Sequence, residues 1–327
     1  MNWTKIYYDR RFPAGCSGKL QLEPTYYLKD YYKTTFLNNN INLDFLEQHP
    51  YCRLVPFPVG KTLSREFMMI TDPWLEAALF IFGLCIGSFM NVCIHRIPRN
   101  ESIVRPGSKC PSCNHAIRFS DNIPILSYTL LKGHCRDCGH KISLRYPVVE
   151  LLGGLLSLSI SAKYPLSLEW FIYYAVSAAL VVIAFIDIDH RIIPDHLTLP
   201  GIVLGFGASF ILPELTPLDS LIGAILGGSI LLSVGLLYYA VAKREGMGGG
   251  DIKLLTMIGA FLGWKGVLFT IVVASFVGSV TGAIVMLKSD KGMKTAVPFG
   301  PFLSISAIAF IHLGPDLVSW YLNLNRY

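Results

Sequence analysis

The stretch TDPWLEAALFIFGLCIGSF, residues 71–89, sets the fold class, because it is apolar enough to begin a membrane-spanning helix. A helix needs roughly 20 apolar residues to cross about 30 Å of hydrocarbon. The composition of the whole chain agrees, since 52% of its 327 residues are hydrophobic and only 15% are charged. Soluble proteins carry about 25% charged residues. The sequence therefore predicts an all-α polytopic membrane protein.

Apolar runs of suitable length recur along the rest of the chain. Pro or Gly residues mark the breaks between them. The runs lie near residues 75–95, 147–164, 168–187, 197–212, 218–241, 252–264, 266–287 and 298–320. We therefore expect about eight transmembrane helices, of which the sixth is the shortest, with 13 residues.

The distribution of positive charge predicts the orientation in the membrane. Nine Lys and Arg residues face three acids between Arg96 and Arg145, and short loops rich in Lys and Arg stay in the cytoplasm. With this loop inside, every second crossing returns to the cytoplasm. The inside turns then carry most of the basic residues that follow this loop in the sequence, at 190–191, 243–244 and 288–294. Topology thus accounts for the net charge of +6, and we expect no nucleic-acid binding.

The sequence divides into four parts by composition. They are an N-terminal extension (residues 1–67), a first transmembrane helix (68–95), a cytoplasmic four-cysteine loop (96–146) and a seven-helix membrane domain (147–327).

The N-terminal extension, residues 1–67, has two interpretations. It lacks the charged start and apolar core of a signal peptide. In the first interpretation, the extension is either untranslated, because translation begins at Met68 or Met69, or translated and disordered. In the second interpretation it is a small extracytoplasmic domain, where Cys16 and Cys52 pair because that side of the membrane is oxidising.

Four cysteines in the cytoplasmic loop form two hooks, C-P-S-C and C-R-D-C, separated by 21 residues. Two such hooks supply four thiolates in a tetrahedron, which is the arrangement that structural zinc prefers. The predicted ligands are Cys110, Cys113, Cys135 and Cys138. The alternatives are a thiol pair and a metal-free loop. We expect the neighbouring His115, His134 and His140 to be bystanders, and the closed site to serve folding rather than catalysis.

Acidic residues inside membrane spans are costly and usually functional. Asp187 ends the third predicted helix in FIDIDHRIIPD (185–195), and Asp251 opens the sixth in GMGGGDIKLL (246–255). Glu150 is a further acid in a predicted span. By the crossing count, Asp187 and Asp251 lie at the same cytoplasmic boundary. Two carboxylates at one depth predict an aspartic-protease pair that shares a proton and activates a water.

The glycines before Asp251 fit a protease that cuts a helical substrate. A peptide bond must leave the helix before water attacks it, and the freed backbone groups need partners. A flexible glycine backbone approaches closely and supplies them, and we assign this role to Gly248, Gly249 and Gly250. Asp189 and His190 are expected to orient or solvate the site, and Lys253 to tune Asp251 or to reach the interface.

A purely structural interpretation of these acids stays open. Asp187 and Asp189 would then be interfacial residues paired with Arg191, and Asp251 would be a plain helix cap.

With these motifs, the chain resembles the type IV prepilin peptidases, also called leader peptidase/N-methyltransferases. The resemblance covers about residues 73–320 and includes the two cysteine hooks and both Asp motifs. It also includes GSFMNVCIHRIPR (87–99), NIPILSY (122–128) and RYPVVE (145–150).

The resemblance implies a multi-pass enzyme of the bacterial inner membrane, in contact with membrane lipid. Such enzymes are G-x-G-D aspartyl proteases that cleave prepilins and pseudopilins on the cytoplasmic face. Carried over by motif, the catalytic pair is Asp187 and Asp251. Many members also methylate the new N-terminal residue with S-adenosylmethionine, and the zinc loop is usually linked to this activity.

The complete cysteine loop favours the bifunctional form. The sequence does not locate the methyl donor, for which Asn122 to Tyr128 and Gly133 are candidates. Two alternatives stay open, a peptidase without methyltransferase activity and a non-enzymatic, zinc-containing membrane assembly protein.

Overall fold

The computed structural model describes residues 73–243, 248–288 and 298–324, all within the compact unit Ile70–Tyr327. The N-terminal extension, residues 1–67, and both interpretations of it lie outside the described residues. Within the described ranges the protein is mostly helical, and β structure is limited to two isolated bridges.

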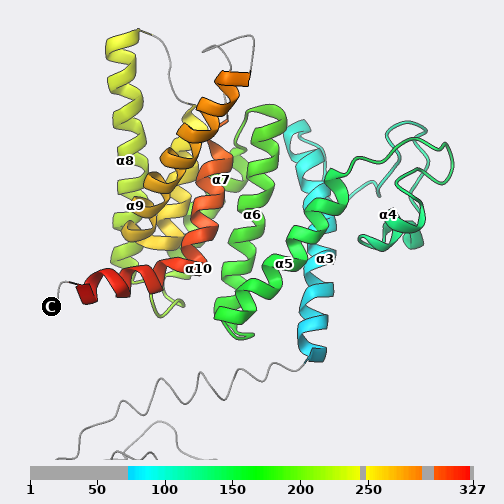
Figure 1. The fold of residues 1–327 in the computed structure, drawn as a ribbon, viewed down its shortest axis with the longest axis horizontal. Coiled ribbons are helices and arrows are strands. Elements are labelled where there is room, and N and C mark those ends of the chain that lie inside the picture. The colour runs from blue at the N-terminus through cyan, green and yellow to red at the C-terminus, as the bar shows by residue number, and fades with distance from the viewer. Residues whose placement is uncertain (1–72, 244–247, 289–297, 325–327) are drawn as a thin grey trace, which may run out of the picture. The chain divides into compact units, whose positions relative to one another are not determined.

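Seven helices of 14 residues or more make up most of the described chain (Figure 1). They are α3 (Pro73–Arg96), α5 (Arg145–Lys163), α6 (Leu168–His190), α7 (Asp195–Ala208), α8 (Pro217–Ala242), α9 (Gly249–Lys288) and α10 (Gly300–Leu324). The loop between α3 and α5 projects to one side of these helices in Figure 1. It contains three short helices, η1 (Ile97–Arg99), η2 (Phe119–Asn122) and α4 (Leu126–Leu130).

Among the described residues, four helices are long and apolar enough to cross a membrane. They are Pro73–Arg99, Leu168–His190, Pro217–Ala242 and Gly249–Leu287. The eight spans expected from the sequence are not confirmed by this criterion. One reason is that α7 has only 14 residues. Another is that the two predicted spans at 252–264 and 266–287 lie in the single helix α9.

A break at Gly263 divides α9 into two halves. Gly263 has φ 68° and ψ −177°, a conformation that glycine adopts without steric cost. Beyond the break, Gly266 lies against Phe310 and Gly278 against Phe302. The second half of α9 therefore runs antiparallel to α10.

The first half of α9 runs antiparallel to α8. A Cβ atom on Gly223 would lie 2.4 Å from the carbonyl oxygen of Gly259, and one on Gly227 would lie 2.5 Å from that of Leu255. Small residues allow two helix backbones to approach this closely in a membrane. Small residues also allow α3 and α5 to pack closely, since a Cβ on Gly83 would lie 2.5 Å from the carbonyl oxygen of Gly153.

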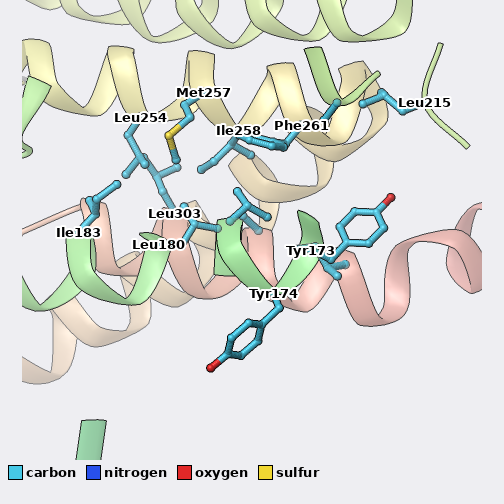
Figure 2. Close-up of a cluster of buried hydrophobic side chains, with 14 of the residues drawn as sticks. Tyr173, Tyr174, Leu180, Ile183, Leu215, Leu254, Met257, Ile258, Phe261 and Leu303 are labelled. Atoms are coloured by element: carbon cyan, nitrogen blue, oxygen red, sulfur yellow. The ribbon is translucent and has the colours of Figure 1, made fainter. Parts of the chain in front are cut away.

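Large apolar side chains fill the space between α6, α9 and α10. Figure 2 shows Leu180 and Ile183 of α6 close to Leu254 and Ile258 of α9 and to Leu303 of α10. These five side chains are at most 1% exposed. Because packed interiors resist changes of volume, this cluster fixes the separation of α6 and α9, the two helices that carry the predicted catalytic acids.

Candidate active site and neighbouring cavity

Asp187 lies in the last turn of α6 and is 5% exposed. Its Oδ2 accepts a hydrogen bond of 3.0 Å from the backbone N–H of Gly300. Gly300 is the first residue of α10, where backbone N–H groups lack helical partners and the helix dipole favours an anion. The start of α10 thus holds the Asp187 carboxylate in place.

Asp251 lies in the first turn of α9, directly after the glycines. Its Oδ1 atom is buried and accepts no hydrogen bond from the described residues. Gly248 lies beside the other oxygen, since a Cβ on Gly248 would be 3.6 Å from Oδ2. An acceptor atom without a partner is available to a water molecule or to a donor on a substrate.

Both acids lie near a common neighbour, Ile193. A Cβ on Gly250 would lie 2.8 Å from the Ile193 Cβ, and one on Gly300 would lie 3.3 Å from the Ile193 Cδ1. The fold therefore brings Asp187 and Asp251 together at one end of α6 and α9. Their catalytic role is a proposal, developed below.

Asp189 forms an ion pair with Arg145, the first residue of α5. The pairing of Asp189 with Arg191, which the structural interpretation expected, does not occur between these described residues. The Arg145 side chain is 26% exposed and that of Asp189 is 32% exposed. This pair joins the start of α5 to the end of α6, next to Asp187.

Lys253 points to an acid other than Asp251. Its Nζ atom lies 2.7 Å and 2.8 Å from the two carboxylate oxygens of Asp195. Asp195 is the first residue of α7, so this pair links the starts of α7 and α9. His190, the third predicted supporting residue, is an exposed residue at the end of α6.

Sequence reasoning missed the roles of two residues at this site, Gly300 and Arg145. The segment PFGP, residues 298–301, opens the last helix, and Pro301 in the first turn is the signal that could have located this helix start. Arg145 was counted only as a topological charge, and its spacing from Asp189 in the sequence gives no sign of the ion pair.

The four predicted zinc ligands form one cluster. The Sγ atoms of Cys110, Cys113, Cys135 and Cys138 all lie within 4.8 Å of one another, and those of Cys110 and Cys138 are 3.8 Å apart. Zinc–thiolate bonds of about 2.3 Å in a tetrahedron place the sulfur atoms roughly 3.8 Å apart. The cluster therefore fits zinc, and no histidine belongs to it within the described chain.

The two cysteine hooks have the same backbone hydrogen bonds. In the first hook the N–H of Cys110 donates to the oxygen of His115, and the N–H of Asn114 donates to the oxygen of Cys110. Cys135, His140 and Gly139 repeat this pattern in the second hook. The loop thus presents two equivalent turns, each with its thiols directed to the shared centre.

Electrostatic contacts support the cysteine cluster. Arg136, inside the second hook, forms a bidentate ion pair with Asp121, at 2.8 Å and 2.6 Å. This pair lowers the pKa of the Asp121 carboxyl. A backbone hydrogen bond from Cys113 lowers the pKa of the Cys110 thiol to about 7. Thiolates are the metal-binding form of cysteine, and the lowered pKa applies to Cys110 alone, since the pKa values of Cys113 and Cys138 are raised.

A cavity of about 920 Å³ lies between α3, the cysteine loop and α5. This volume is in the range of small-molecule sites, about 300–1,000 Å³. The predicted methyl-donor segment Asn122 to Tyr128 contributes Ile125 and Tyr128 to the lining. Gly133 supports Tyr128, because a Cβ there would lie 2.9 Å from the Tyr128 hydroxyl.

Comparison with protein families gives two matches. Residues 81–164 match the bacterial peptidase A24 N-terminal domain, which covers α3, the cysteine loop and α5. Residues 174–283 match the type IV leader peptidase family, a range that includes both Asp187 and Asp251.

Several curated proteins are similar along most of their length, and each of those below is named a prepilin leader peptidase/N-methyltransferase. A protein of Aeromonas salmonicida is 37% identical, over 77% of this chain and 95% of its own. One of Pseudomonas aeruginosa is 35% identical, over 74% and 91%. One of Myxococcus xanthus is 40% identical, over 67% of this chain and 65% of its own. No solved structure matches the chain.

Proposed function

Because the chain belongs to the type IV leader peptidase family, we propose that it removes the leader peptide of prepilins and pseudopilins and methylates the new N-terminal residue. The peptidase activity is supported by the position of Ile193, which lies beside Gly250, next to Asp251, and beside Gly300, the hydrogen-bond partner of Asp187. The observation that carries the methyltransferase half is the cavity beside the cysteine cluster.

Cleavage requires a water nucleophile and a polarised carbonyl. In a two-aspartate site, one carboxylate takes a proton from water while the other, protonated, donates to the oxygen of the scissile carbonyl. The hydrogen bond from Gly300 occupies Oδ2 of Asp187, which leaves Oδ1 of this carboxyl for the reaction. Oδ1 of Asp251 has no partner among the described residues and completes the site.

The glycines at 248–250 give the substrate backbone access to this pair. Gly248 and Gly249 are exposed, and no atom lies within 4 Å of a Cβ placed on Gly249. An unwound substrate segment has free N–H and C=O groups that need partners where water is scarce. The exposed glycine backbone offers such partners without side chains in the way.

We further propose eight membrane crossings, with the active site on the cytoplasmic face of a bacterial inner membrane. Helix directions support this number. The Arg145–Asp189 pair makes α5 and α6 antiparallel, and the Lys253–Asp195 pair places the starts of α7 and α9 at the same end. The reversal at Gly263 lets α9 cross twice. The basic loop between α3 and α5 supports the cytoplasmic assignment.

Zinc fits the four thiols of the cysteine cluster, and we propose that Cys110, Cys113, Cys135 and Cys138 hold it as thiolates. A closed tetrathiolate centre supplies folding energy and has no open position for chemistry. Its role is to fix the loop, and with it the wall of the cavity.

S-adenosylmethionine fits the cavity by size and by its lining, which contains both polar and apolar side chains. Bound there, it would supply an electrophilic methyl group. The part played by the chain is to bind, to exclude water and to present the peptide amine. Tyr128 and Ile125 would contribute the apolar surface that such a ligand needs.

One reaction in membranes tests both halves of the proposal. A prepilin is incubated with S-adenosylmethionine and either the wild type, Asp187→Asn or Asp251→Asn, and intact mass reports cleavage and methylation separately. Asn at position 187 keeps an acceptor for the Gly300 N–H, so the fold is preserved. We expect both variants to lose cleavage.

The control for this experiment is Glu169→Gln, which removes a carboxylate from the first turn of α6, at the end opposite Asp187. It should cleave like the wild type. Full cleavage by either Asp variant would refute the site assignment. If the wild type cleaves the prepilin without adding a methyl group, the protein is a peptidase without methyltransferase activity, which is the second candidate function.

A further inference from the structure

Glu150 is a buried acid that the peptidase mechanism does not use. It lies one turn into α5, lines the 920 Å³ cavity and is 8% exposed. No described Lys, Arg or His forms an ion pair with it. An acid buried without a cation is costly in its charged form, so it is protonated, paired or bound to a ligand. A positively charged ligand would supply the missing partner.

The backbone around Glu150 is arranged to hold its carboxylate. Oε2 accepts a hydrogen bond of 2.8 Å from the N–H of Ile125. Ile125 has φ 60° and ψ −48°, a strained conformation that is rare for a β-branched residue. The N–H of Leu126 donates to the oxygen of Pro124 across this residue, which makes a γ-turn. Strained backbone of this kind clusters at ligand sites.

A second buried acceptor lies on the facing helix. Asn91 of α3 lines the same cavity and is 4% exposed. Its Nδ2 donates to the oxygen of Tyr146 at 3.0 Å, while its Oδ1 has no partner among the described residues. The two helices touch at this point, because a Cβ on Gly87 would lie 2.6 Å from the Glu150 Cα. Carboxylate and amide oxygens together suit a donor with several N–H groups.

The cavity also borders the peptidase site. Arg145 lines the cavity and forms the ion pair with Asp189. Asp189 is two residues beyond Asp187 on α6, a rise of about 3 Å along the helix. A peptide cut at Asp187 and Asp251 therefore has its new amino terminus close to the wall of this cavity.

We propose that Glu150 binds the new N-terminal ammonium group of the cleaved peptide and accepts a proton from it. The proposal rests on the function proposed above. In this step an N–H bond of the ammonium breaks and an O–H bond forms on the carboxylate, which leaves a neutral amine with a free electron pair. Only the neutral amine is a nucleophile toward a methyl donor. Glu150 later releases the proton to water, and Asn91 contributes a second acceptor.

The first test compares Glu150→Gln with the wild type in the membrane reaction. Gln keeps an oxygen for the Ile125 N–H but removes the charge, so cleavage should stay unchanged while methylation falls about tenfold or more, the effect expected of a lost charged hydrogen bond. The matched control is Glu169→Gln, an acid in the first turn of α6 that does not line the cavity, which should methylate like the wild type. Equal methylation by Glu150→Gln and the wild type overturns the proposal.

The second test measures binding instead of activity. Purified full-length protein in detergent binds a fluorescent peptide with the mature N-terminal sequence of the substrate, either with a free amine or N-acetylated. The wild type should bind the free amine about tenfold more tightly, and Glu150→Gln should lose this preference. A wild type without the preference overturns the proposal even if Glu150→Gln fails to fold.

The methyl donor also carries an ammonium group, so a third experiment distinguishes the ammonium group of the donor from that of the cleaved peptide. Equilibrium dialysis with labelled S-adenosylmethionine should give the same affinity for Glu150→Gln and the wild type. If the variant loses this affinity and keeps its preference for the free amine, Glu150 serves the donor and the assignment to the peptide is wrong. If the wild type cleaves but never methylates, the proposed function fails, independently of Glu150.

Discussion

At the level of single residues, the candidate active site depends on backbone as much as on side chains. Asp187 is held by the N–H of Gly300, and Asp251 follows three glycines. Glycine is required where another group approaches too closely for a Cβ. At Gly300 that group is the carboxylate itself, because a Cβ would lie 2.6 Å from Oδ2 of Asp187.

Gly300→Ala is therefore expected to lower prepilin cleavage about ten- to a hundredfold, since a misplacement of about 1 Å at a reacting group has effects of this size. The added methyl group must push the Asp187 carboxylate away. The rate of leader removal, followed by gel shift or intact mass, measures the effect. The control is Gly282→Ala in α9, where no atom lies within 4 Å of the new Cβ. Equal rates for the two variants would contradict the role of Gly300.

At the level of helices, contacts between small residues determine the packing. The α8–α9 contact is the closest such approach in the described chain, with a Cβ on Gly259 placed 2.2 Å from the oxygen of Gly223. Because α9 carries Asp251 in its first turn, displacement of α9 from α8 would also move the candidate site.

We expect Gly259→Ala to destabilise the protein by about 1–3 kcal/mol, the usual effect of overpacking. Thermal unfolding in detergent, followed by tryptophan fluorescence, measures the loss as a lower Tm. Gly235→Ala in α8 is the matched control, because nothing lies within 4 Å of a Cβ at that position. If Gly259→Ala unfolds at the same temperature as this control, the close helix contact does not exist in solution.

The cysteine loop gives a prediction about metal. Cys113→Ser should remove zinc, measured by elemental analysis, and should reduce methylation more than cleavage, because the loop forms the cavity wall and not the Asp pair. The control is Cys85→Ser, an exposed thiol of α3 outside the cluster. Normal methylation by a zinc-free protein would show that the metal has no part in shaping the cavity.

The same loop should release zinc as the pH falls. Zinc is held by thiolates, so each of the four thiols must lose its proton to bind the metal. Protons and zinc compete for thiolates, so zinc affinity is expected to be full in mildly alkaline buffer and to decrease through and below pH 7. A colorimetric chelator in a pH series measures the released metal. Constant occupancy down to strongly acidic pH would contradict a thiolate centre.

Sequence patterns predicted the helices and the cysteine cluster because both depend on local spacing. Runs of apolar residues gave the elements, and α6 and α8 begin and end close to the expected residues. Two C-x-x-C hooks imply a common centre for the same reason. The partners of Asp187 and Asp189 could not be predicted, because Gly300 and Arg145 are 113 and 44 positions away. Such contacts arise from the packing of α5 and α10 against α6.

At the level of the whole molecule, the number of crossings decides whether the two acids meet. If only the four longest apolar helices crossed, Leu168–His190 would carry Asp187 outward, while Gly249–Leu287 would begin with Asp251 on the inner side. The two acids would then lie on opposite faces. Their common neighbour Ile193 contradicts this. If α7 also crosses, Asp187 and Asp251 lie on the same face of the membrane. If α5 crosses as well, Arg145 and Asp189 lie on the same face, as their ion pair requires.

Reporter fusions should distinguish eight crossings from four. With eight, a fusion after Pro165 lies outside and one after Arg191 lies in the cytoplasm. With four, both positions exchange sides. A fusion at Gly133 is cytoplasmic in both cases and serves as the control. We expect alkaline phosphatase to be active only at Pro165, and a cytoplasmic fluorescent reporter only at Arg191 and Gly133. The opposite result at Pro165 and Arg191 would place Asp187 on the outer face, and it would contradict both the eight crossings and a cytoplasmic active site.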